Sequence, residues 1–470
     1  MAVLEKRLPP ARPPQRFAPK GEPLAGAFFW LSAFFAVYCV RPEDWIPGLS
    51  FIPLAKISGV FAVLALVMSA GRSQRRFRDL PREAIYFFGI ICLLLVSAAL
   101  SPVWKGGAFF KTLDFSKALV AWVLTFIVIT SFARLRRIIF IQSASVALIA
   151  VVSVLKGRSS PRLEGVIGGI YSNPNDLAFA IVLTLPFCFA FLLSTRSMPR
   201  KIAWVGSMMV MCVALFLTAS RAGFIDLLVM GTVCLWIFGV RGKRFHLVAA
   251  GLVVALVVGF TAGGKLKDRF FAISGSDLET ENDISAHGSY EQRRLLISES
   301  IKAIAHYPLG LGMDNFANYS GTWREVHVSY LQIAAEGGIG ALVLYVLFFA
   351  RGFSNLRRLR RIPNHDAEID LFSGALYGSL IGFIVGAFFA PEAYEYFPYF
   401  AVAYTSVLLA MANEKQESEA PALEPKQPQP RWLKHFRDGK FSSTRAGDAK
   451  LSAGAAGSLR DQSDSLRKRR

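Results

Sequence analysis

Two residues in this chain combine reactive side chains with positions beside long apolar stretches. His327 lies within GLGMDNFANYSGTWREVHVSYLQIAAEGG, residues 310–338, where a polar segment meets an apolar one. Arg221 lies in TASRAG, at the end of another apolar stretch. An imidazole titrates near 6.5 and accepts a proton at neutral pH, whereas a guanidinium remains cationic. A base and a fixed cation facing one compartment suit chemistry on lipid-linked substrates at a membrane surface.

The composition predicts that membrane-spanning helices position these two residues. The chain has 470 residues, of which 53% are hydrophobic, and its mean hydropathy is +0.41. It contains about twelve apolar stretches of roughly 16 to 22 residues, near the 20 or so that a helix needs to cross a bilayer. Barrel strands would be shorter and would alternate. We therefore expect an all-α polytopic membrane protein with about twelve transmembrane helices and one long periplasmic loop that contains a helix.

The expected organisation has five parts. The predicted spans are 25–40, 53–70, 84–100, 117–133, 138–155, 175–194, 202–219, 223–240, 247–263, 329–350, 372–390 and 397–412. Around them we expect a cytoplasmic Pro-rich and basic N-terminus (1–24), nine helices (25–263), a long periplasmic loop (264–328), three helices (329–412) and a basic tail (413–470). Residues 1–24 lack a signal-peptidase site, so the first span is expected to remain as an anchor.

The net charge of +20 is explained by membrane topology. Of the 53 Lys and Arg residues, 24 lie in segments 1–24, 71–83, 134–137, 195–201, 241–246 and 351–371, and 13 more lie in the tail. These segments face the cytoplasm if the chain starts inside, in keeping with the positive-inside bias. Both termini are therefore predicted to be cytoplasmic, with membrane lipid rather than nucleic acid as the partner. The tail is poor in apolar residues and is predicted to be disordered.

The cysteines and acidic residues predict neither a cofactor nor a metal. All five cysteines, Cys39, Cys92, Cys188, Cys212 and Cys234, fall inside predicted spans and form no CxxC pair. They suit packing rather than a disulfide or zinc framework. The predicted outer loops offer no DxD or HExxH cluster.

The long predicted loop contains a helix-like segment, SYEQRRLLISESIKAIAHYPLG. Ile297, Ile301 and Ile304 recur at helical spacing and predict one apolar stripe that lies on the mouth of the bundle. Arg293 continues this stripe four residues before Ile297, with Arg294 beside it. Either arginine is a candidate second cation, and the stripe favours Arg293 as the one that faces the bundle.

Four motifs in this order resemble the O-antigen ligase and polymerase family of bacterial membrane glycosyltransferases. They are YSNPND before the sixth span, TASRAG between the seventh and eighth, HYPLGLGMDNF in the loop, and HVSYLQIAAEGG at the tenth. The resemblance covers roughly residues 165–350. The family commonly has Asn after the motif histidine, where this chain has Val328.

The resemblance implies that a glycan moves from undecaprenyl diphosphate to an acceptor hydroxyl on the periplasmic face of the bacterial inner membrane. The reaction would be a metal-independent, inverting displacement. His327 would then be the base, or would orient the hydroxyl. Arg221 would hold the departing diphosphate, with Arg293 or Arg294 as a second cation. Without such a role, His327 anchors the tenth helix and Arg221 reaches to lipid headgroups.

Asn173, Asn175 and Asp176 precede or begin the sixth span. Their side chains suit capping of that helix, because Asn and Asp oxygens accept hydrogen bonds from its free amide groups. Binding of substrate by Asn173 and Asn175 is the alternative.

Two carboxylates and one tyrosine are predicted to support the site from within the spans. Asp226 lies in the eighth span and Glu336 in the tenth, where a buried charge is costly and often functional. Asp226 follows Arg221 by five residues and is expected either to orient it or to pack as a neutral acid. Tyr330 follows His327 by three residues and would share its helical face, chiefly for packing.

The motifs leave the acceptor open. A lipid core of lipopolysaccharide, a growing polysaccharide and a protein Ser or Thr hydroxyl are all compatible with the same donor chemistry. A transporter or flippase for lipid-linked glycans is the alternative from another class, and only Asp226 and Glu336 favour a path through the membrane. A pure scaffold would explain the topology but not the pairing of Arg221 with His327.

Overall fold

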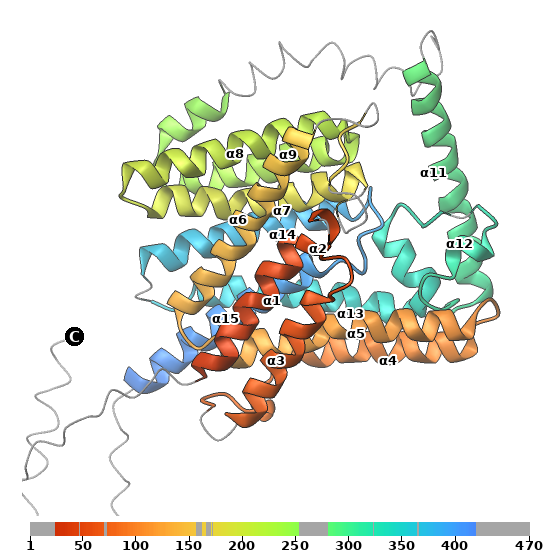
Figure 1. Ribbon diagram of the computed structural model, residues 1–470, viewed down its shortest axis with the longest axis horizontal. Helices are drawn as coiled ribbons and strands as arrows, with labels where there is room; N and C mark the ends of the chain where they lie inside the picture. The colour runs from red at the N-terminus through yellow and green to blue at the C-terminus, as the bar shows by residue number, and fades with distance from the viewer. Residues whose placement is uncertain are drawn as a thin grey trace, which may run out of the picture. The chain divides into compact units, whose positions relative to one another are not determined.

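The computed structural model describes most of the chain between residues 24 and 419. The described residues are 24–46, 48–69, 73–156, 162–165, 171, 173–252, 281–322, 324–363 and 366–419. Within them every regular element is a helix (Figure 1), which confirms the all-α class. The chain divides into two units, Met1–Gln416 and Glu417–Arg470. The helices considered below belong to the first unit, apart from the last residues of α15.

The helices follow one another along the chain with short connections in most places. They are α1 (Ala25–Val40), α2 (Pro42–Trp45), α3 (Leu54–Met68), η2 (Phe77–Asp79), α4 (Arg82–Leu100), α5 (Lys105–Val128), α6 (Phe132–Lys156), α7 (Pro174–Ser194), α8 (Met198–Thr218), α9 (Arg221–Cys234), η3 (Leu235–Arg241), α11 (Glu281–His306), α12 (Phe316–Tyr319), α13 (Ser329–Leu359), α14 (Ala367–Gly386) and α15 (Tyr396–Glu419).

Eight helical segments in the described part are long and apolar enough to cross a membrane. They are Ala25–Trp45, Arg82–Leu100, Phe132–Lys156, Pro174–Ser194, Met198–Thr218, Arg221–Arg241, Ser329–Leu359 and Ala367–Gly386. The chain is thus a multi-pass membrane protein. The count of twelve is not confirmed. The helices at the predicted second, fourth and twelfth spans, α3, α5 and α15, are not among the eight, and most of the predicted ninth span and the first part of the predicted long loop lie outside the described residues.

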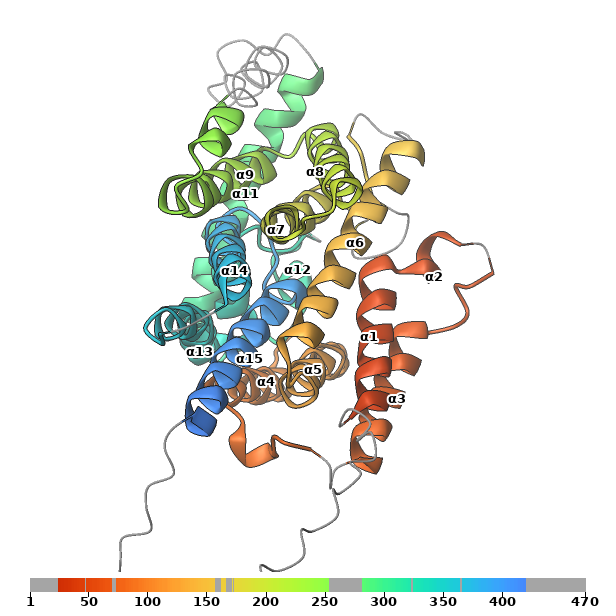
Figure 2. The same ribbon diagram turned by 90° about the vertical axis from the view of Figure 1, so that its left-hand side faces the viewer.

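Helix α7 lies at the centre of the helices that carry the predicted site. It packs against α6, α8, α9 and α14, and Figure 2 looks along it with α6, α8 and α14 around it. Its side chains from Leu177 to Cys188 are all buried, as expected for a helix that is apolar on every side. Pro174 at its first position fits a helix start, because that amide needs no intrahelical partner.

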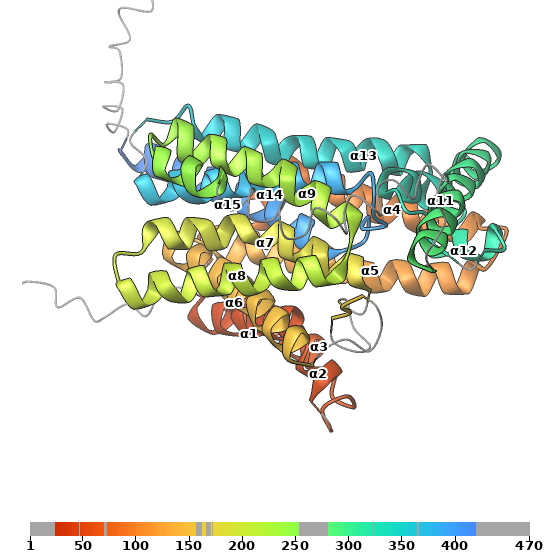
Figure 3. The ribbon, with the colours of Figure 1, turned by 90° about the horizontal axis from the view of Figure 1, so that it is seen from above.

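The helices of the bundle end at two opposite sides. We call the side that carries α11, α12 and the start of α13 the loop end. Figure 3 shows α11 and α12 gathered there, next to the start of α13. Hydrogen bonds tie the segment after α11 to α4. The Ser97 hydroxyl accepts from the Gly312 amide at 2.8 Å, and the Asn315 amide group donates to the Ser101 hydroxyl at 2.8 Å. Gly312 has φ +91°, a left-handed turn that glycine adopts without strain.

Buried and paired arginines mark the opposite end. Arg75, 3% exposed, forms an ion pair with Glu414 at 2.7 Å and donates to the carbonyl oxygens of Phe126 and Ile129 at 2.8 and 2.9 Å. It therefore joins the segment before α4 to the end of α5 and to α15. Arg75 lies in segment 71–83 and Glu414 lies in the tail from 413, and both of these segments are predicted to be cytoplasmic. The side of the membrane that they face remains a prediction.

Helix α11 crosses α13 (Figure 1) and packs against it. The predicted apolar stripe is wrong for two of its three isoleucines, because Ile297 and Ile301 are 37% and 55% exposed, whereas Ile304 is partly buried against the neighbouring apolar cluster. The buried side chains are instead Leu296, Ser300 and Ala303. Their spacing of four and three residues is equally helical, and the small side chains of Ser300 and Ala303 allow closer approach to the neighbouring helix than isoleucine would.

Candidate active site

His327 lies in the extended segment that leads into α13, whose first residue is Ser329. The sequence-based placement of this histidine at the junction of a loop and a helix is correct. Its side chain is half-buried, and Nδ1 lies 3.0 Å from the Glu325 carbonyl oxygen. With Nδ1 donating to that oxygen, Nε2 is the nitrogen that accepts a proton. Burial, and then the charges of Arg293 and Arg324, lower the pKa of His327 below its usual value.

Arg293 is the arginine of α11 that the structure brings near His327. Its charge acts on the imidazole, its side chain is half-buried, and its Nε is buried without a hydrogen-bond partner in the described part of the chain. Burial lowers the pKa of Arg293, yet a guanidinium remains cationic at neutral pH. Arg294 is exposed. A buried guanidinium N–H that lacks an acceptor suits an anionic ligand.

Arg221 is the first residue of α9 and is half-buried. The preceding Ser220 caps the helix by accepting a hydrogen bond from the Gly223 amide at 3.1 Å. The Ser220 hydroxyl also donates to Asn175 Oδ1 at 2.8 Å, and Arg162 donates to the same oxygen at 2.9 Å. A second cation, Arg162, therefore lies at the junction of α7 and α9 beside Arg221. Sequence reasoning missed it, and its only signal was one more basic residue in a segment predicted to lie outside.

The three polar residues at the start of α7 have different roles. Asn173 caps the helix by accepting from the Asn175 amide at 2.9 Å, as predicted. The side chain of Asn175 is not a cap, because its oxygen accepts from Ser220 and Arg162 instead. Asp176 faces a pocket that is described below. Only the first of the three residues therefore caps α7 through its side chain.

The end of α14 connects the Arg221 segment to the His327 segment. Asp226, about one and a half turns into α9 from Arg221, lies against Gly386, where an added Cβ would be 2.6 Å from Asp226 Oδ2. The next residue, Ala387, accepts a hydrogen bond from the Ser329 amide at 2.8 Å. Arg221 and His327 thus belong to the same end of the bundle. They make no direct contact that the described structure records.

The predicted orientation of Arg221 by Asp226 is not found. Asp226 is 1% exposed, and neither of its carboxyl oxygens has a hydrogen-bond partner in the described residues. Its neighbour is the backbone of Gly386, because α9 packs against α14 at this level. Burial of this group without an ion pair fits the alternative, a neutral acid that packs.

Tyr330 does not share a helical face with His327, because the histidine precedes the helix. The Tyr330 hydroxyl donates to the Ile384 carbonyl oxygen at 2.9 Å, and its ring packs on Phe388 at 4.7 Å between centroids. Its predicted packing role fits these contacts. Glu336 is 1% exposed, one of its carboxyl oxygens has no described partner, and the carboxyl group lies beside the Tyr394 hydroxyl.

The connection between α14 and α15, residues 387–395, is clamped to the start of α13. The Ser329 hydroxyl donates to the Ala390 carbonyl oxygen at 2.7 Å and accepts from the Glu392 amide at 2.9 Å. Gln332 accepts from the Ala393 amide at 3.3 Å. This clamp was missed in the sequence, since its two sides lie about sixty residues apart.

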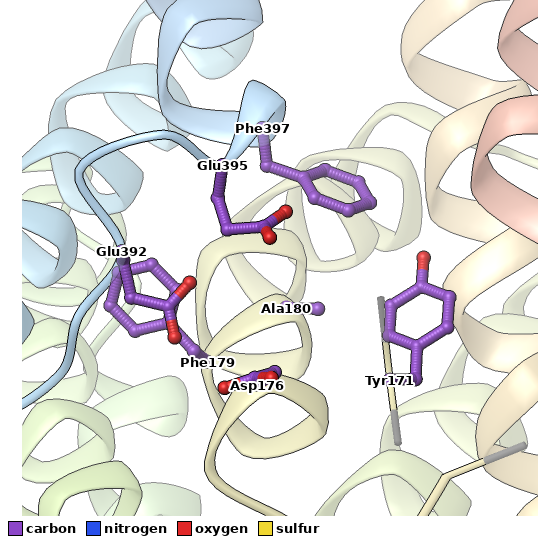
Figure 4. A pocket seen from close by; sticks show the side chains of 7 residues that line it. All are labelled: Tyr171, Asp176, Phe179, Ala180, Glu392, Glu395 and Phe397. Atoms are coloured by element: carbon purple, nitrogen blue, oxygen red, sulfur yellow. The ribbon is translucent and has the colours of Figure 1, made fainter. Parts of the chain in front are cut away.

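A small pocket, with room for about one water-sized group, lies between α7 and residues 387–395 (Figure 4). It is lined by Tyr171, Asp176, Phe179, Ala180, Glu392, Glu395 and Phe397. Burial, and then the charge of Asp176, raise the pKa of Glu395 to about 8, and the same causes raise the pKa of Glu392 well above its usual value.

Residues 206–346 match the O-antigen ligase family. This part of the chain is similar to O-antigen ligases. The matched segment contains Arg221, Arg293 and His327, whereas Asn173, Asp176 and Glu392 lie outside it. The match supports a membrane glycosyltransferase of the O-antigen ligase or polymerase type in general. A search of curated proteins found no match to the chain.

Proposed function

We propose that this protein transfers a glycan from undecaprenyl diphosphate to an acceptor hydroxyl at the loop end of the bundle, on the periplasmic side. The observation that carries the proposal is that the charge of Arg293, whose Nε is buried without a described partner, acts on His327 within the segment that matches O-antigen ligases. In a displacement at a diphosphate-linked sugar, a base can take the proton of the attacking hydroxyl group, and a cation can stabilise the departing diphosphate.

In the proposed step the acceptor oxygen attacks the anomeric carbon from the face opposite the diphosphate. The bond from that carbon to the diphosphate oxygen breaks, and undecaprenyl diphosphate leaves with the electron pair. The acceptor proton passes to His327 Nε2. The hydrogen bond from Nδ1 to the Glu325 carbonyl oxygen supports this tautomer, because it leaves the other nitrogen basic.

Two cations are assigned to the leaving diphosphate. Arg293 approaches from α11 and Arg221 from the start of α9, and each guanidinium can donate paired hydrogen bonds to phosphate oxygens. Charge grows on the diphosphate as the bond breaks, so a cation already in place stabilises the transition state more than the ground state. Arg293 also acts on His327, since its charge adds to burial in lowering the pKa of the imidazole.

The test uses purified protein, a lipid-linked glycan and candidate acceptors, and it follows the release of free undecaprenyl diphosphate. Arg293→Gln and Arg294→Gln are a matched pair, because they remove the same charge from neighbouring positions of α11. We expect Arg293→Gln to lower the rate by roughly 10- to 100-fold, from the loss of one or two charge-assisted hydrogen bonds. Arg294→Gln should remain near wild type. Equal effects from the two variants would contradict the assignment.

The same assay separates the acceptors and the alternative function. Release that requires a lipid core, a polysaccharide or a peptide hydroxyl identifies the acceptor class. Failure of release with every acceptor, together with movement of the lipid-linked glycan across vesicles, would overturn the transferase in favour of a transporter.

A further inference from the structure

The pocket between α7 and residues 387–395 is unusual in its charge. Three of its seven lining residues are acidic, and none is basic. In the described part of the chain, no ion pair joins a basic side chain to Asp176, Glu392 or Glu395. The positive charge that acts on Glu395 is Arg41, which is itself paired with Asp44 at 2.6 Å.

Glu392 is the most constrained of the three acids. It is 2% exposed, and its Oε1 is buried without a hydrogen-bond partner in the described residues. Its carboxyl group lies within hydrogen-bonding reach of Asp176. Two adjacent carboxyl groups require a shared proton or a cation between them, because two negative charges so close repel each other strongly. Figure 4 shows the carboxyl groups of Asp176, Glu392 and Glu395 around one space above α7.

The aromatic residues that line the pocket indicate which class of ligand it can bind. Phe397 and Tyr171 stand across the pocket from Glu392 (Figure 4), and the Tyr171 hydroxyl is already used in a hydrogen bond to the Cys39 carbonyl oxygen at 2.9 Å. The faces of aromatic rings carry partial negative charge, which attracts organic cations. No group of three acidic, histidine or cysteine side chains in the described residues has the arrangement of a metal site. A primary ammonium group supplies three donors, is about the size of the one water-sized group that the pocket admits, and would replace the shared proton as the positive charge between the carboxyl groups.

We propose that this pocket binds a primary ammonium group carried by the acceptor. The assignment to the acceptor rests on the proposed glycan transfer, whereas the binding of the amine does not. The pocket is coupled to the site through Ser329, which follows His327 by two residues and accepts the Glu392 amide hydrogen bond at 2.9 Å. An acceptor whose amine occupies the pocket would hold its hydroxyl groups close to the base.

The first test measures binding of ethanolamine and of ethylene glycol to the full-length wild-type protein in lipid nanodiscs, by ligand-observed NMR. The two probes differ only in an ammonium group in place of a hydroxyl group. We expect ethanolamine to bind at least about tenfold more tightly, the value of one charge-assisted hydrogen bond. Equal binding of the two probes, or binding of neither, would overturn the proposal without bearing on glycan transfer.

Variants locate the binding. Glu392→Gln keeps the side-chain shape and should abolish the preference for ethanolamine, and Glu395→Gln should weaken it. Asp114→Asn is the matched control, because it removes one negative charge from an exposed side chain of α5 and should leave binding unchanged. A preference that survives Glu392→Gln would place the amine elsewhere and contradict the proposal.

A second arm connects the pocket to catalysis. With an amine-bearing acceptor, N-acetylation of the amine should raise KM about tenfold for wild type and leave KM unchanged for Glu392→Gln. If acetylation leaves the wild-type KM unchanged, the acceptor assignment is wrong. If ethanolamine binds the pocket but no acceptor releases undecaprenyl diphosphate, the glycan transfer fails and the amine site stands.

Discussion

At the scale of single residues, the tautomer and the pKa of the His327 imidazole depend on one backbone oxygen, on burial and on two arginines. The Glu325 carbonyl oxygen accepts a hydrogen bond from its Nδ1, while burial, and then the charges of Arg293 and Arg324, lower its pKa. The base is therefore neutral over a wider pH range than an exposed histidine. In the proposed reaction Arg293 would have two effects, because the guanidinium that would receive the diphosphate also disfavours protonation of His327.

The pH dependence of transfer should report this arrangement. Protonation of His327 removes the base, and since its pKa lies below 6.5, the acidic fall in kcat/KM should have its midpoint below pH 6.5. Arg324→Gln removes a charge that lowers this pKa, so the midpoint should move to higher pH. Arg294→Gln is the control for loss of a nearby exposed cation. If the midpoint stays in place or moves to lower pH in Arg324→Gln, a group other than His327 controls the fall in kcat/KM at acidic pH.

At the scale of elements, the start of α13 is held by the connection between α14 and α15. Ser329 is fully buried and makes three hydrogen bonds to that connection, one through its amide and two through its hydroxyl. His327 belongs to the same strand of chain, so the clamp positions the base. The pocket carboxylate Glu392 lies on the other side of the clamp.

Loss of the clamp should reduce turnover more than binding. Ser329→Ala leaves the Ala390 carbonyl and the Glu392 amide without their partner, at about 1–3 kcal/mol. We expect a lower kcat with a small change in KM, since His327 loses its position while the donor cations remain. Ser207→Ala is the matched control, because that hydroxyl bonds only within its own helix at an exposed position. A purely structural role would lower the melting temperature and leave kcat per folded molecule unchanged.

Element placement also decides how far sequence reasoning reaches. The switch from polar to apolar residues at 329 is local, so the position of His327 before a helix was predictable. The contact face of α11 was not, because Ile297 and Leu296 are neighbours and only the shape of the packing partner selects between them. The clamp and the pocket depend on contacts between residues about sixty or more positions apart, for which the sequence carries no periodic signal.

At the scale of the whole molecule, the polar chemistry is divided between the two ends of the bundle. The loop end carries the candidate base, its cations and the acidic pocket. The opposite end carries arginines whose bonds are structural, of which Arg75 is the most buried. Changes at the opposite end should therefore affect stability and not the reaction.

Arg75→Met tests this division. It removes the pair with Glu414 and the two bonds to the end of α5, and since Glu414 is half-exposed the cost should be about 2 kcal/mol. The melting temperature should fall, while kcat/KM per folded molecule should be unchanged. Arg76→Met, at an exposed neighbouring position, should change neither. A loss of activity without a loss of stability in Arg75→Met would contradict the division.

The most direct measurement of the central claim is acceptor-dependent release of undecaprenyl diphosphate by His327→Ala, compared with His306→Ala. Both histidines lie in the segment between α11 and α13 or at its edge, and His306 is exposed at the end of α11. We expect His327→Ala to lose about 10²- to 10⁴-fold in rate, the usual contribution of a general base, and His306→Ala to match wild type. Full release by His327→Ala at normal protein level would contradict the assignment of the base.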